Sequence, residues 1–198
     1  MTIFESPAPL EWGMLDVPLF GLKKDWHGRE MDAPAGFSLA SDGRRLWFIA
    51  SHGRPATLHP GSRPGKFCTE LWKYDVAELW LGNPENGRYF EFNLAPNGAW
   101  WSCEFKGPRE REEDVEIAMP EVATFSELGP DGSWVAAMAL PIQLLKARLD
   151  FGAETLANVT FVLESPGQRL LTAVDLGGGE PDFHQPGKFR KIYFRKAG

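Results

Sequence analysis

Apolar and polar residues alternate over short stretches of this chain, and turn-forming residues separate one stretch from the next. In residues 88–95, every second side chain is apolar: Phe90, Phe92 and Leu94. Alternation with a period of two is typical of a β-strand that buries one face. The pattern predicts a strand here, with these three side chains directed into a core. The opposite face would carry the remaining side chains, Tyr89, Glu91 and Asn93.

The same criteria predict further strands separated by turns. They cover residues 37–40, 45–51, 71–81, 99–105, 133–140, 158–164, 169–174 and 191–195, with less regular strands at 17–21 and within 115–125, where a proline interrupts the pattern. Asp42-Gly43 lies between the first two strands and is typical of a hairpin turn. In residues 71–81, a period of two places Trp72, Glu78 and Trp80 on one side of a strand.

About ten strands without alternating helices predict the fold class. We expect an all-β protein, an antiparallel β-sandwich of jelly-roll-like type. Residues 142–149 have apolar side chains at helical spacing and predict one short helix. Both faces of residues 45–51 are fairly apolar, so this strand is expected inside a sheet rather than at its edge. A length of 198 residues fits one domain, residues 1–198.

Composition and charge exclude several classes of protein. Hydrophobic residues make up 43% of the chain, with eight Trp and fourteen Phe, which argues against disorder. The net charge of −6 gives no general attraction to nucleic acid or anionic lipid, so neither is an expected partner. The basic C-terminal segment 188–196 alternates with apolar residues, and this favours a closing edge strand with a solvated face.

Cys68 and Cys103 are the two cysteines, and they have neither the number for a disulfide framework nor a metal-binding spacing. We expect both to be buried free thiols. The N-terminal residues do not have the pattern of a secretory signal, and no apolar run is long enough to span a membrane. The expected location is therefore the cytoplasm, without a membrane partner. No feature of the sequence indicates the oligomeric state.

Enzyme motifs are missing from the sequence. It contains no G-x-S-x-G, P-loop, G-x-G-x-x-G or H-E-x-x-H, and none of the four His pairs with another at i+2 or i+4. We predict no catalytic residues, although a catalytic set dispersed along the chain stays open because such sets are spatial. The abundant aromatic residues favour sugar binding instead, because rings stack on sugar faces while carboxylates bind hydroxyls.

Residues 71–101, LWKYDVAELWLGNPENGRYFEFNLAPNGAWW, resemble a segment of family 9-like carbohydrate-binding modules and their DOMON-like relatives. That segment reads W-x-x-D-x-x-E and then Tyr-x-Glu-Phe-x-x-x-Pro-Asn-Gly. Residues 132–141 resemble the family's "Gly-x-Trp… Ile-Pro" strand, and residues 181–189, PDFHQPGKF, resemble its late "His-Arg-Pro-x-x-Phe-Gly" loop. The three segments follow the family's order.

The resemblance implies a non-catalytic β-sandwich module that binds a small carbohydrate or related polar ligand. In the family, two Trp rings clamp a sugar and a Glu accepts hydrogen bonds from the sugar hydroxyls. The roles of the first Trp and of the Glu would fall on Trp72 and Glu78. The late loop has no Trp, so Phe183 would replace the second ring with His184 beside it. Asp75 matches the motif's Asp. The resemblance also implies calcium, for which no ligands could be mapped; no other cofactor is predicted.

Two alternatives stay open at this point. The DOMON-like resemblance could instead imply a haem or redox module, for which Met119, Met138 and His184 would be candidate axial ligands. The protein could also be a structural or interaction protein whose sheet face docks a partner without a small ligand.

Overall fold

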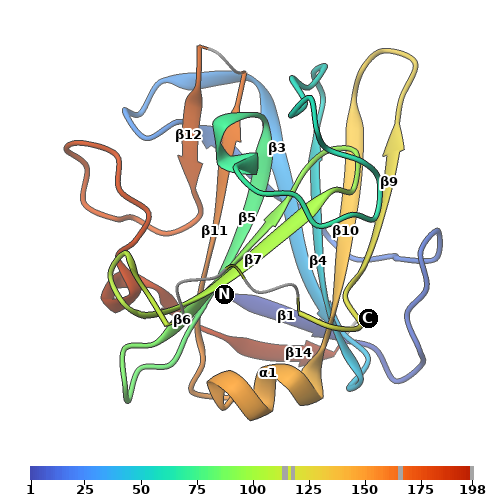
Figure 1. Ribbon diagram of the computed structural model, residues 1–198. Helices are drawn as coiled ribbons and strands as arrows, with labels where there is room; N and C mark the ends of the chain where they lie inside the picture. Colours follow the sequence, from blue (N-terminus) through green and yellow to red (C-terminus); the bar gives the residue numbers. More distant parts are fainter. Residues whose placement is uncertain (113–115, 117–118, 165–166, 197–198) are drawn as a thin grey trace.

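The computed structural model describes residues 1–112, 116, 119–164 and 167–196, which form two seven-stranded β-sheets (Figure 1). Sheet 1 comprises β1 (Thr2–Glu5), β2 (Phe20–Lys24), β3 (Glu30–Ser41), β4 (Arg45–His52), β9 (Ala123–Leu128), β10 (Trp134–Pro141) and β14 (Tyr193–Lys196). Sheet 2 comprises β5 (Val76–Gly82), β6 (Tyr89–Leu94), β7 (Trp100–Gly107), β8 (Glu110–Arg111), β11 (Leu156–Leu163), β12 (Arg169–Thr172) and β13 (Arg190–Lys191).

The strand order in sheet 1 is β14-β1-β3-β4-β10-β9, with β2 paired to β3. In sheet 2 the order is β12-β11-β5-β6-β7-β8, with β13 paired to β11. The pairs are antiparallel except that β1 runs parallel to both β14 and β3. The all-β sandwich expected from the sequence is confirmed, and β4 lies inside its sheet, as its apolar faces predicted.

The core lies between the sheets and is built from the alternating apolar side chains of both. Phe90, Phe92 and Leu94 of β6 are fully buried there, together with Phe48 of β4 and Phe161 of β11. Burying each such side chain stabilises the fold by about 1.5–3 kcal/mol. The predicted inward face of β6 is therefore confirmed.

Helix α1 (Ile142–Leu149) has the bounds that the sequence predicted and lies at one end of the sandwich (Figure 1). Ile142, Leu145 and Leu149 form its buried face, at the spacing of one helix stripe. Asp150 ends the helix in a left-handed conformation with φ 55°, and its N–H bonds the Leu145 and Lys146 carbonyls.

The predicted strand 71–81 is wrong in its first half. Leu71–Lys73 form a 3₁₀ turn, η1, and β5 begins only at Val76. Glu70 adopts a positive φ of 60° before this turn, and the Tyr74 N–H closes it on the Leu71 carbonyl. Trp72 therefore does not share the period of Glu78 and Trp80, although those two do lie on one face.

Other strand boundaries also differ from the sequence-based ones. The described residues contain fourteen strands rather than about ten; β1 and the short β8 had no clear pattern in the sequence, and β13 and β14 were predicted as a single strand. The predicted closing strand 191–195 is two strands, since the chain passes from sheet 2 to sheet 1 at the buried Ile192. Of the predicted strand within 115–125, residues 115, 117 and 118 lie outside the described residues, and β9 covers Ala123–Leu128.

The two free thiols differ in burial: Cys103 is buried as expected, whereas Cys68 is half-exposed, so that part of the prediction is wrong. In the part of the chain that the structure describes, no helix combines the length and the apolar character of a membrane span.

Asp25 joins the turn before β3 to β12. Its buried carboxylate accepts hydrogen bonds from Arg29 Nε at 2.8 Å and Arg169 Nε at 2.7 Å. Burial alone would raise the pKa of Asp25, but the bonds from the two arginines outweigh it and lower the pKa to about 2. The ionised carboxylate is thus favoured in the folded state.

We expect Asp25→Asn to lower the free energy of unfolding by about 2 kcal/mol near neutral pH, because two guanidinium groups lose their charged acceptor. The wild-type contribution is present above the unfolded-state pKa of about 4 and is lost as the pH falls toward about 2. Urea unfolding at about pH 7 and about pH 3 measures both effects. The difference between the two proteins should shrink at the lower pH; a constant difference would contradict this assignment.

Candidate functional site

A cavity of about 420 Å³ lies on the outer face of sheet 2, the face directed away from sheet 1. Side chains on this face, including Trp80, Tyr89 and Trp101, form an apolar cluster separate from the core between the sheets. The aromatic residues that line the cavity are Trp72, Trp80, Trp101, Phe105 and Phe183. Its polar lining consists of Glu78, Glu91, Arg109, Arg111, Gln168 and His184.

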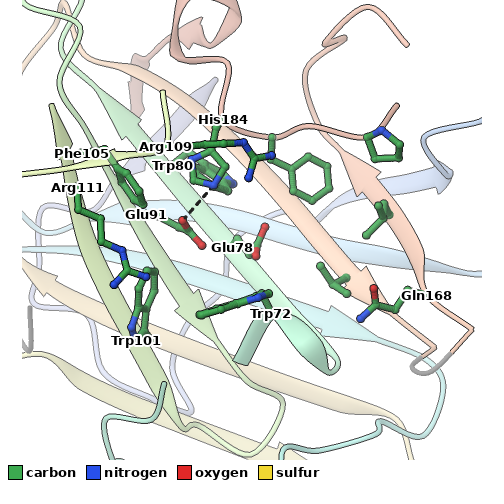
Figure 2. A pocket seen from close by; sticks show the side chains of 14 residues that line it. Trp72, Glu78, Trp80, Glu91, Trp101, Phe105, Arg109, Arg111, Gln168 and His184 are labelled. Carbon is green, nitrogen blue, oxygen red and sulfur yellow. Dashed lines mark ion pairs between the residues drawn. The ribbon is translucent and has the colours of Figure 1, made fainter. Parts of the chain in front are cut away.

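The strand register sets the floor of the cavity. Glu78 of β5 lies opposite Asn93 of β6, and Trp80 lies opposite Glu91. Because side chains alternate along a strand, all four point to the same face, and the two glutamates are diagonal neighbours. Figure 2 shows both carboxyl groups between Trp72 and His184 in this view.

Glu78 is almost completely buried, with 2% of its surface exposed. Thr160 Oγ1 on β11 donates a hydrogen bond of 2.5 Å to Glu78 Oε2, and Thr160 in turn accepts one of 2.8 Å from Trp80 Nε1. Burial raises the pKa of Glu78 well above its usual range, and the bond from Thr160 only partly opposes this. The carboxyl group is held in a fixed position in a medium that disfavours its charge.

Glu91 is also buried, with 5% of its surface exposed, and its pKa depends on the charge of Glu78. Burial raises the pKa of Glu91, and the charge of Glu78 raises it further, while the Asn93 side chain and the charges of Arg111 and Arg109 act in the opposite direction. Two neighbouring buried carboxyl groups titrate as one system, and burial and repulsion both favour its protonated form.

His184 belongs to the late loop and covers one end of the floor. The Tyr89 hydroxyl accepts a hydrogen bond from the backbone N–H of Arg109 at 3.1 Å and forms a second one with His184 Nδ1, at 2.7 Å. Burial lowers the pKa of His184 to about 4, with a smaller effect of the Arg109 charge. The ring is therefore neutral near pH 7, and donation from the Tyr89 hydroxyl to Nδ1 would place its proton on Nε2, which lies 4.0 Å from Glu91 Oε2.

We expect His184 to show the Nε2–H tautomer from about pH 6 to about pH 8. A two-bond ¹H–¹⁵N correlation spectrum of the imidazole measures this directly. Because the folded-state pKa is lowered, His184 costs stability only as the pH falls below its unfolded value, about 6.5, toward about 4. A ring that becomes charged near pH 6.5, or a dominant Nδ1–H tautomer, would contradict the described network.

The rim of the cavity carries two arginines and a tryptophan pair. Arg109 Nη2 donates to Asp182 Oδ1 at 2.8 Å. The Arg111 guanidinium lies over the Trp101 ring, 5.8 Å from its centroid. Trp72, half-buried on η1, meets Trp101 edge-on at 5.7 Å. One wall is thus aromatic and leaves part of the Trp72 ring accessible.

The structure brings all four predicted ligand-binding residues, Trp72, Glu78, Phe183 and His184, to this one cavity. Phe183 is half-buried between Trp80, at a ring distance of 6.4 Å, and Trp26, at 5.8 Å. Asp75 does not line the cavity; its buried carboxylate accepts the Thr57 N–H at 3.3 Å, which is a structural role.

Sequence reasoning missed Glu91, Trp80 and Trp101 as cavity residues. The sequence did place Glu91 on the outward face of this strand, opposite Phe90 and Phe92, but gave that face no role in a site. The available signal was the aromatic content of the same face on the neighbouring strands, which excludes water from it. Arg109 and Arg111 belong to a charged segment whose position over sheet 2 has no sequence signature.

No metal or haem site is supported among the described residues. They contain no group of three or more His, Cys, Asp or Glu that could hold a metal ion, so no ligand set for the calcium implied by the resemblance is identified among them. Met119 and Met138 are buried in the core between the sheets, whereas His184 lies on the outer face of sheet 2. The candidate haem ligands are therefore not brought together.

Comparisons with known proteins agree on the fold. No protein-family model and no curated protein matches the chain. A crystal structure of a candidate carbohydrate-binding protein from Bacteroides uniformis is similar, with a TM-score of 0.75 and 15% identity over 98% of both chains.

Two structures of a carbohydrate-binding module of family 9 from Caldicellulosiruptor kristjanssonii are also similar. The glucose complex has a TM-score of 0.65 and 13% identity, over 100% of this chain and 96% of that one. The cellotriose complex has a TM-score of 0.63 and 15% identity, over 100% and 94%. The chain thus has the fold of family 9 carbohydrate-binding modules, as the sequence resemblance implied.

Proposed function

We propose that this protein binds a carbohydrate non-catalytically in the cavity on sheet 2. The observation that carries the proposal is the pairing of an accessible indole ring, Trp72, with a floor of buried carboxyl groups, Glu78 and Glu91. A pyranose ring presents C–H groups on its faces and hydroxyls around its edge. The indole ring can stack on the C–H groups, and the carboxylates can accept hydrogen bonds from the hydroxyls.

The energetics of the floor support a binding role. Burying an ionisable group without a charged partner costs stability, so such groups in a cleft are candidates for function. The cavity volume of about 420 Å³ is also within the usual range of ligand sites, about 300–1,000 Å³. The glucose and cellotriose complexes of the family 9 module show that the same fold accommodates sugars.

In the proposed complex, Trp72 stacks on one sugar face and Phe183 borders the ring from the late loop. Glu78 accepts hydrogen bonds from sugar hydroxyls, because Thr160 occupies only one of its two oxygens. His184 Nε2–H points toward Glu91 and supplies a donor at the same end of the site. The set lacks an activated nucleophile with a base beside it, which is why we propose binding rather than catalysis.

Calorimetric titration with a panel of mono- and disaccharides tests this proposal. We expect at least one sugar to bind, and Trp72→Ala to weaken it about tenfold or more through loss of stacking. Trp12→Ala is the matched control, because Trp12 stacks on Phe125 at 5.7 Å in an apolar cluster away from sheet 2. Absence of binding by every sugar would refute the function, and unchanged affinity in Trp72→Ala would refute the site.

A further inference from the structure

Glu78 and Glu91 differ from two other buried carboxylates of this protein because, among the described residues, neither forms an ion pair with Lys or Arg. Asp25 accepts bonds from Arg29 and Arg169, and Glu104 is paired with Arg88 and Arg148. These arginine pairs stabilise the fold around a charge that would otherwise be costly.

The cavity pair has no such compensation. Within 4.0 Å of either carboxylate, the described residues place one basic nitrogen, Nε2 of the neutral His184. The bond to Glu78 comes from the uncharged hydroxyl of Thr160. Two acidic groups therefore meet at the floor of a cavity with aromatic walls, and neither forms an ion pair with a Lys or Arg of the described residues.

The two arginines of the rim are engaged elsewhere. Arg109 Nη2 pairs with Asp182 Oδ1 at 2.8 Å, and its side chain is exposed. Arg111 Nη1 lies 3.7 Å from Glu116 Oε1, and its guanidinium covers Trp101. Their charges lower the pKa of Glu91, but by less than burial and the charge of Glu78 raise it. A positive charge beside Glu78 and Glu91 would therefore come from the ligand.

We propose that the preferred ligand is an amino sugar, whose ammonium group binds between Glu78 and Glu91; this inference rests on the proposed carbohydrate-binding function. An ammonium has three N–H donors and a full charge, enough to bond both carboxylates at once. A neutral hydroxyl donates one hydrogen and leaves the pair holding a shared proton. The indole rings of Trp72 and Trp80 add a further preference for a cation.

Binding of the cation is coupled to proton release. Burial raises the pKa of both groups, and the charge of Glu78 raises that of Glu91 further, so we expect the free pair to hold a proton. The ammonium displaces that proton from a carboxyl O–H to the buffer and keeps its own.

Of the other groups that face the pair, burial lowers the pKa of His184 to about 4 and raises that of Cys103 to about 11, and burial also raises that of Tyr89. None of these three changes charge near neutral pH, and Arg109, Arg111 and Asp182 stay at the rim.

Isothermal titration at about pH 7 with glucose, glucosamine and N-acetylglucosamine tests the inference, in two buffers of different ionisation enthalpy. We expect glucosamine to bind about tenfold tighter than glucose and N-acetylglucosamine, because only it carries the charge. Glucosamine should release about one proton, whereas glucose should release none. Glu91→Gln, which keeps the shape of the side chain, should reduce the preference to about threefold or less.

Each contrary result has a separate meaning. Glucose binding as tightly as glucosamine, or N-acetylglucosamine matching it, overturns the amino-sugar inference and leaves the proposed function in place. A preference for glucosamine that survives in Glu91→Gln without proton release also overturns it. No binding of any of the three sugars overturns the inference and counts against the proposed function as well.

Discussion

Glu78→Gln is expected to raise the free energy of unfolding by about 1–3 kcal/mol near neutral pH while weakening sugar binding by about 10- to 100-fold. The stability gain follows from burial, because the amide has no charge to desolvate and its oxygen can still accept the bond from Thr160. The binding loss follows from replacing a charged acceptor by a neutral one. Thermal or urea unfolding, with titration of the same samples, measures both.

The pH dependence of this gain gives a second test. The folded-state pKa of Glu78 is raised, so the wild-type protein loses stability as the pH rises above the unfolded value, about 4.3. The advantage of Glu78→Gln should therefore vanish at about pH 4 and grow toward neutral pH.

The control for Glu78→Gln is the same change at Glu85, which is exposed in the turn between β5 and β6. It should alter stability by less than about 0.5 kcal/mol and leave binding unchanged. A Glu78→Gln protein that is less stable than wild type at neutral pH would contradict the account, because the carboxylate would then be a net contributor to the fold.

Trp80→Ala is expected to cost about 3–5 kcal/mol of unfolding free energy. Trp80 is 1% exposed, its ring lies 5.0 Å from that of His184, and its Nε1–H donates to Thr160. Its removal leaves a cavity and takes the donor from the hydroxyl that holds Glu78. Opening the site to water should also raise the pKa of His184 from about 4 toward its usual range.

Denaturant unfolding and a histidine NMR titration check the two effects of Trp80→Ala. Trp80→Phe retains most of the packing and is expected to cost less than about 2 kcal/mol. If Trp80→Ala costs less than about 1 kcal/mol, or if the pKa of His184 stays where it is, then Trp80 does not support the floor of the cavity.

The fold followed from the sequence because the core strands have a clean period. Phe90, Phe92 and Leu94 alternate without interruption, and α1 has its three buried side chains at helical spacing. The parallel strand β1 was not predictable, since its four residues acquire their partners only from β3 and the C-terminal β14. The 3₁₀ turn at Leu71–Lys73 was missed because strand-forming residues there are overridden by the backbone turn at Glu70.

The candidate site was predictable where a motif names the residues and not where tertiary packing creates the environment. Trp72, Glu78, Phe183 and His184 followed from the resemblance and meet in one cavity. Glu91 did not follow, because an alternating polar position reads as solvated unless the neighbouring strands are known to bury it. Whether a cation pairs with Glu78 or Glu91 depends on residues that are distant in the sequence, so no local sequence pattern predicts it.

The central claim, that a sugar binds over sheet 2, is tested most directly by the tryptophan indole signals in a ¹H–¹⁵N spectrum during titration with a sugar. Eight Trp residues give eight such signals. The account predicts that the signals of Trp72, Trp80 and Trp101 shift, while those of Trp12 and Trp47, in the apolar cluster away from sheet 2, stay unchanged. Shifts confined to Trp12 and Trp47, or no shifts at saturating sugar, would contradict it.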